Sequence, residues 1–170
     1  SIRTRAKLSS KQYILLLRSF RDREGREAPD DFAWTYTSDG MDYQMKKGRS
    51  MVTDLTKALN GILPVVSISR YKFKNDVDLA HAIQLYSTDE NWFEAFRLLV
   101  DGAKSIVIIP GDSEGLWDEI TVIMNSDLRK KTMIFQPPKM ETEFDSNASQ
   151  VWESYQIFTE RMKQEFNVKL

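Results

Sequence analysis

The sequence contains no cysteine and only one histidine. The lack of cysteine excludes disulfides, thiolate metal sites, iron–sulfur clusters and a cysteine nucleophile. The two signs of charge nearly cancel, with 24 basic and 25 acidic residues, so no overall field attracts nucleic acid, and we expect no such partner. No apolar run approaches the roughly 20 residues that cross a bilayer. The 170 residues are enough for one domain with its own hydrophobic core.

Several catalytic motifs are also missing. The sequence has no glycine-rich dinucleotide loop, no phosphate-binding loop and no nucleophile elbow. The single histidine, His81, is expected to have a structural role because no partner carboxylate can be assigned to it. Asp76 and Asp78 lie in a lysine-rich loop, where two carboxylates are too few to hold a divalent ion. We therefore expect no metal site.

The chain divides into three parts by charge and hydropathy. Residues 1–11 hold four basic side chains and no acidic one, which predicts a basic arm. Residues 12–140 alternate short apolar runs with segments of helical period, as expected for an α/β domain. Residues 141–170 begin as an acidic linker and continue as an amphipathic helix, which we expect to pack on the domain.

Five short apolar runs predict strands, and they are residues 13–17, 63–68, 82–86, 105–109 and 131–136. Helical periods follow at residues 50–60, 92–100, 116–124 and 151–166. Because the strand runs are apolar throughout rather than alternating, they are expected to be buried on both faces. The order of elements predicts an α/β, flavodoxin-like, mostly parallel five-stranded sheet with helices on both faces.

Two helix starts carry capping signals. The run Ser87-Thr88-Asp89-Glu90 predicts a capping box before the helix at 92–100. Asp112 or Ser113 is expected to cap the next helix.

The segment from Ser105 to Ile120 places a buried strand directly before a polar turn and an acidic helix start. Amide groups at such a helix start can hold an anion or a sugar hydroxyl, and a carboxylate one turn further can stabilise positive charge on a sugar ring. The alternative interpretation is that the acidic residues only favour the positive end of the helix dipole. These residues are Asp112, Glu114, Asp118 and Glu119.

The strand Ile106-Val107-Ile108-Ile109, followed by Ser113, Trp117 and Glu119, resembles the fourth strand and following helix of Toll/interleukin-1 receptor (TIR) domains. The spacing of Gly115 and Glu119 also resembles nucleoside deoxyribosyltransferases. Both families cleave N-glycosidic bonds with that glutamate. The resemblance therefore implies a nucleotide-type ligand such as NAD, taken as a substrate rather than a permanently bound cofactor, and a catalytic role for Glu119.

The stretch from Leu16 to Asp22 resembles bacterial TIR-like domains attached to membrane helices, as do Asp89 with Trp92 and Gly115-Leu116-Trp117. This resemblance implies two groups of ligand-binding residues. Arg18, Ser19 and Phe20 would line the ribose or phosphate side, and Asp112, Ser113 and Trp117 the other. Together with the start at Ser1 and the basic arm, it predicts a cytoplasmic domain whose membrane attachment lies outside this chain.

Two hypotheses for function stay open. The first is a TIR-like signalling or defence domain that binds a nucleotide and hydrolyses the N-glycosidic bond of NAD. The second is a noncatalytic module that self-associates with like domains; it is favoured because Trp117 and Glu119 are two residues apart rather than the three usual in TIR enzymes. A Glu119 that points into a pocket near Arg18 would favour the first, and a Glu119 in a surface ion pair the second.

Overall fold

The computed structural model describes residues 12–19, 35–36, 49–70, 82–88, 90–136 and 146–170, with the side chains of 35–36, 49–53, 69–70 and 146–152 left out. Several sequence expectations therefore lie outside the described residues. They are the basic arm at 1–11, Phe20, the loop with Asp76, Asp78 and His81, and the acidic linker at 141–145.

Five parallel strands form the central sheet, in the order β5-β4-β1-β6-β7. Their bounds are β1 Ile14–Leu17, β4 Val65–Arg70, β5 Ile83–Ser87, β6 Ser105–Ile108 and β7 Thr132–Ile134. Numbered among themselves, these strands run 3-2-1-4-5, so β1 is central and the direction of winding reverses between β1 and β6. A separate antiparallel pair, β2 Thr35–Tyr36 with β3 Arg49–Ser50, was not expected from the sequence.

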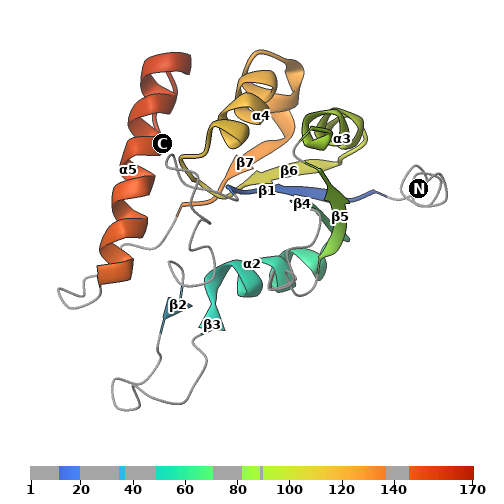
Figure 1. Cartoon of the computed structure of the whole chain (residues 1–170), viewed down its shortest axis with the longest axis horizontal. Coiled ribbons are helices and arrows are strands. Elements are labelled where there is room, and N and C mark those ends of the chain that lie inside the picture. The colour runs from blue at the N-terminus through green and yellow to red at the C-terminus, as the bar shows by residue number, and fades with distance from the viewer. Residues whose placement is uncertain (1–11, 20–34, 37–48, 71–81, 89, 137–145) are drawn as a thin grey trace.

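Helices cover both faces of this sheet (Figure 1). Helix α2 (Met51–Asn60) lies on one face, and α3 (Trp92–Val100), α4 (Glu114–Met124) and α5 (Ser146–Phe166) lie on the other. The structure thus confirms the expected flavodoxin-like α/β class, a sheet covered by helices on both faces, with five strands that are all parallel. The strand order 3-2-1-4-5 is the one found in dinucleotide-binding sheets, whereas flavodoxin itself has the order 2-1-3-4-5. Among the described residues, no helix combines the length and apolar character that a membrane span requires.

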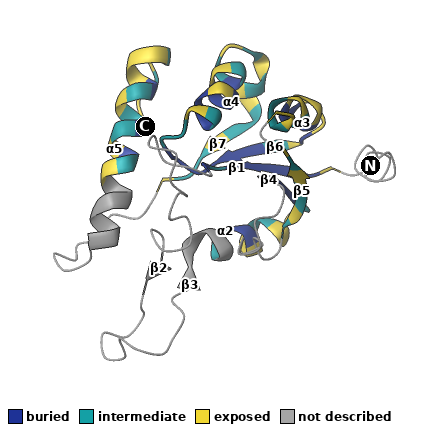
Figure 2. Ribbon diagram, in the orientation of Figure 1, coloured by how far each residue is buried: buried dark blue, intermediate teal, exposed yellow. Residues whose placement is uncertain are grey.

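The central strand explains why the apolar runs do not alternate. Leu15 and Leu17 join the core beneath α3, α4 and α5, whereas Ile14 and Leu16 join a second core cluster, against which Leu55 of α2 packs. The side chains of β1 therefore point alternately into two apolar layers, and all four are buried (Figure 2). A strand in this position must be apolar at every residue.

Helix α5 packs on the same core as α4. Phe158 and Met162 are fully buried in the larger cluster, and the ring of Phe158 lies 5.2 Å from that of Trp117. Arg161 of the same helix also lies over Trp117, with its guanidinium carbon 4.2 Å from the centre of the ring. It also pairs with Glu114 at the start of α4 at 3.2 Å. The C-terminal helix is thus held to α4 by an apolar contact and a cation above it.

Two local expectations were wrong. The capping box at residues 87–90 does not form, because the N-cap of α3 is Asn91, whose side-chain amide instead donates to the Thr88 hydroxyl at 3.0 Å. The strand expected from residue 131 begins one residue later, because a 3₁₀ helix, η1 (Asp127–Lys131), precedes it. This helix is capped by Ser126, whose hydroxyl accepts from the backbone N–H of Leu128.

The C-terminal end of α3 is sealed by two side chains from elsewhere in the chain. Tyr13 donates its hydroxyl to the carbonyl of Leu99 at 2.6 Å. Lys131 donates to the carbonyls of Val100, Asp101 and Ala103 at 3.0, 3.2 and 2.7 Å. Carbonyls at a helix end have no partner within the helix, so a cation there satisfies them and complements the helix dipole.

We expect Lys131→Met to lower the free energy of unfolding by about 1–3 kcal/mol, because these helix-end carbonyls lose a charged donor. The measurement is urea-induced unfolding, monitored by circular dichroism. The matched control is Lys130→Met, since the Lys130 side chain is 72% exposed in a surface pair with Asp127 and should change stability by less than about 0.5 kcal/mol. Equal effects of the two substitutions would contradict the sealing role of Lys131.

Candidate site at the strand-order reversal

The carboxyl ends of β1 and β6 meet where the strand order reverses. Ser19, two residues after β1, is buried and accepts hydrogen bonds from the backbone N–H and the hydroxyl of Ser113, at 3.3 and 3.0 Å. Residues far apart in the sequence are thereby joined at the point where doubly wound sheets bind their ligands. We refer to Ser19, Gly111, Asp112 and Ser113 as the reversal junction.

Ser113 is the N-cap of α4, as the sequence allowed. Its backbone is extended, and its hydroxyl accepts from the backbone N–H of Leu116 at 3.4 Å. The first turn of α4 therefore starts at the junction, with its positive dipole end directed there. Asp112, just before the cap, is half-buried.

Gly111 allows the two strand ends to approach each other. A Cβ atom at this position would lie 2.1 Å from Ser19 Oγ and 2.7 Å from Ser19 Cβ. Only glycine fits this approach without displacement of the chain. The sequence gives no sign of this contact, because the contact depends on a residue more than ninety positions away.

Glu119 lies on the buried face of α4 and is 5% exposed. Burial is the main cause that raises the pKa of its carboxyl group, to about 8, and the neighbouring charge of Asp118 adds to it. Among the described residues, no hydrogen bond or ion pair reaches this carboxyl group. At neutral pH Glu119 is therefore mainly a neutral acid.

The side of α4 that carries Glu119 faces α3. Helical periodicity puts Glu119 on the same side as Gly115, one turn earlier, and Val122, one turn later. Gly115 lies against the Trp92 ring of α3, whose nearest atom would be 3.6 Å from an added Cβ. Long helical side chains generally lean toward the helix N-terminus, and for a residue at position 119 this is the direction of the turn where α4 leaves the junction.

The structure brings together some of the expected site residues and separates others. Arg18 is half-buried beside Ser19, at the same strand end. Trp117, which was expected to line the ligand, is 2% exposed and lies beneath Arg161 in the contact with α5. It belongs to the core. In the described part of the chain, no three His, Cys, Asp or Glu side chains are placed to hold a metal.

The fold and the junction define a doubly wound α/β protein with a candidate ligand site at its topological switch point. Comparison with known proteins assigns no family to it: no family model, no curated protein and no solved structure matches the chain. The case for function rests on the junction and Glu119.

We expect Gly111→Ala to lower the free energy of unfolding by about 1–3 kcal/mol, because the new methyl group overlaps Ser19. Gly115→Ala is the control: an added Cβ meets only ordinary contacts, and helix propensity predicts a gain of about 0.5–1 kcal/mol. Adding Ser19→Gly to Gly111→Ala should recover part of the loss. Thermal unfolding of the four proteins checks this, and a Gly111→Ala protein as stable as Gly115→Ala would refute the close approach.

The raised pKa of Glu119 predicts how stability depends on pH. The folded state holds this proton more tightly than the unfolded chain, whose value is near 4.5. The stabilising contribution is therefore complete below pH 4.5 and is lost as the pH rises to about 8. Glu119→Gln, which stays neutral, should gain stability over the native protein by about 1 kcal/mol per pH unit across this window.

Thermal midpoints of both proteins, measured from about pH 5 to about pH 9, check this expectation. The control is Glu160→Gln, the same substitution at an exposed position of α5. Parallel curves for the native protein and Glu119→Gln would show that Glu119 is ionised in the folded state throughout.

Proposed function

We propose that this chain is a TIR-like signalling or defence domain that binds a nucleotide at the reversal junction and hydrolyses the N-glycosidic bond of NAD. The observation that carries the proposal is the joining of Ser19 to Ser113 at the start of α4, with a buried, ionisable Glu119 further along the same helix. Hydroxyl and amide groups at a helix start suit the phosphate and ribose of a nucleotide. The cytoplasm, where NAD is present, is the proposed location.

Hydrolysis of NAD suits an ionised carboxylate, because the leaving nicotinamide does not have to be protonated by the enzyme. In hydrolysis the bond between the ribose C1′ and the nicotinamide nitrogen breaks, and its electron pair neutralises the positive pyridinium ring. Nicotinamide leaves as a neutral molecule, while water adds to C1′ and releases a proton. The enzyme must therefore stabilise positive charge at C1′ and accept a proton, and ionised Glu119 can do both.

The burial of Glu119 links this chemistry to pH. With a pKa of about 8, about a tenth of the Glu119 groups are ionised at pH 7. A cationic nicotinamide ring placed beside the carboxyl group would favour its charged form and lower this pKa. Binding of NAD is thus proposed to release a proton and to activate the residue at the same time.

We expect slow nicotinamide release from NAD at high protein concentration, and a loss of at least about a hundredfold in Glu119→Gln. The rate should rise with pH up to the pKa of Glu119, because the carboxylate is the active form. Asp118→Asn is the matched variant: Asp118 is exposed at the position just before Glu119 in α4 and raises the pKa of Glu119. This variant should keep activity and shift the profile to lower pH.

A noncatalytic assembly module is the second candidate. The core position of Trp117 favours it, because this residue then cannot stack on a ligand as the enzymatic interpretation expected. Equal nicotinamide release by Glu119→Gln, or no release under conditions that promote assembly, would remove the enzymatic proposal. Sedimentation velocity over a range of protein concentrations then tests self-association directly.

A further inference from the structure

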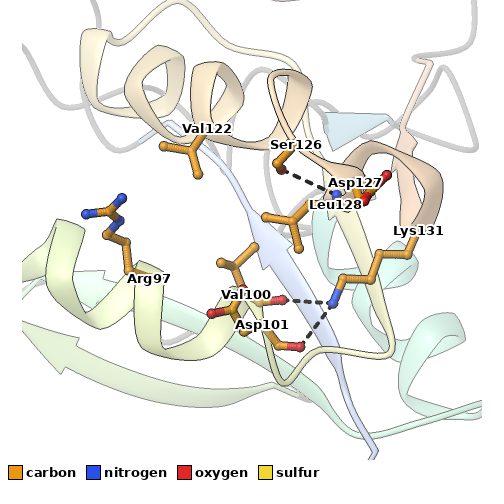
Figure 3. A pocket seen from close by; sticks show the side chains of 8 residues that line it. All are labelled: Arg97, Val100, Asp101, Val122, Ser126, Asp127, Leu128 and Lys131. Atoms are coloured by element: carbon orange, nitrogen blue, oxygen red, sulfur yellow. Dashed lines mark hydrogen bonds between the residues drawn. The ribbon is translucent and has the colours of Figure 1, made fainter.

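A second candidate binding site lies at the opposite end of the sheet. A cavity of about 520 Å³ opens between the C-terminal end of α3, the C-terminal half of α4 and η1 (Figure 3). Asp101 and Lys131, which line it, directly precede the loop into β6 and the start of β7. The cavity is thus at the amino ends of these strands, whereas the reversal junction is at the carboxyl ends.

The middle of the cavity is apolar. Val100, Val122 and Leu128 come from α3, α4 and η1, and they project into the same space (Figure 3). A volume of this size is within the range of small-molecule sites, about 300–1,000 Å³. Its walls therefore suit a short hydrocarbon or similar apolar body.

Most polar groups around the cavity already have partners. The Lys131 ammonium group donates hydrogen bonds to three backbone carbonyls, and Asp127 pairs with Lys130 at 2.7 Å. The Ser126 hydroxyl donates to the carbonyl of Ile123 and accepts from the N–H of Leu128. These groups close one end of the cavity and have little capacity left for a ligand.

Arg97 is different. It stands at the other end of the cavity from Asp127 and Lys131 (Figure 3). Its guanidinium carbon lies 5.8 Å from the centre of the Phe93 ring, and within the described chain no carboxylate or carbonyl accepts from it. A guanidinium with free donors at the edge of an apolar cavity is suited to a carboxylate or a similar anion.

We propose that this cavity binds a small amphipathic anion, with its charged head on Arg97 and its apolar body against Val100, Val122 and Leu128. The Asp127 carboxylate at the far end disfavours an anionic head there, so the ligand has one orientation. The site is independent of the reversal junction, because it shares no residue with it.

The probe ligand is octanoate. Its binding is monitored in methyl NMR spectra of the protein labelled at valine and leucine. We expect the methyl signals of Val100, Val122 and Leu128 to shift with a dissociation constant of about 1 mM, as suits a ligand of this size. Octanol and octylammonium have the same tail without the negative charge. They should bind at least about tenfold more weakly.

Arg97→Gln tests the anchor. Arg97 is exposed on α3, so the substitution should leave the fold intact and weaken octanoate binding at least about tenfold. The matched control is Arg129→Gln, an exposed cation of η1 that does not line the cavity, and it should bind octanoate as the native protein does. No methyl shift at about 10 mM octanoate, shifts confined to other residues, octanol binding as tight as octanoate, or unchanged binding by Arg97→Gln would each overturn the proposal.

Discussion

The burial of β1 on both faces is the constraint on which the other elements depend. This strand pairs with β4 on one side and β6 on the other, and its side chains are buried in both apolar layers. The residues that flank it fix the two ends of the molecule. Tyr13 ties the amino end to α3, and Ser19 ties the carboxyl end to α4. Any shift of β1 along its axis would disturb both the cavity and the reversal junction.

Different sides of helix α4 contact different neighbouring helices. Trp117 and Glu119 are two residues apart, which separates them by about 200° around the helix. Trp117 accordingly meets Phe158 of α5, whereas Glu119 lies on the side toward α3. The spacing alone could have shown that these residues do not line one ligand. The resemblance to a known family placed both at the site, and helix geometry separates them.

The fold was largely predictable because the signals that define it are local and apolar. Continuous runs such as 105–109 predict buried strands, and the stripe through Phe158 and Met162 predicts a helix that packs on the core. The capping of α4 by Ser113 follows from one residue and its immediate neighbours. Such features need no knowledge of distant parts of the chain.

The candidate sites were less predictable because they depend on distant contacts. A five-residue 3₁₀ helix has no hydrophobic period that reveals it, and three polar signals at 87–89 outweighed Asn91 as the expected cap. Lys131 looks like any surface lysine until its three carbonyl partners are known. Glu119 was singled out by resemblance, but its neutral state at pH 7 follows from burial that only the tertiary structure provides.

The close approach of Gly111 to Ser19 also bears on how this protein can change over evolutionary time. Because a side chain at 111 would occupy the space of the side chain at 19, the two positions share one small volume. A larger residue at either position requires a smaller one at the other, so the order in which substitutions arise matters. Among natural variants of this chain, positions 19 and 111 should therefore covary, and a library that randomises one should also randomise the other.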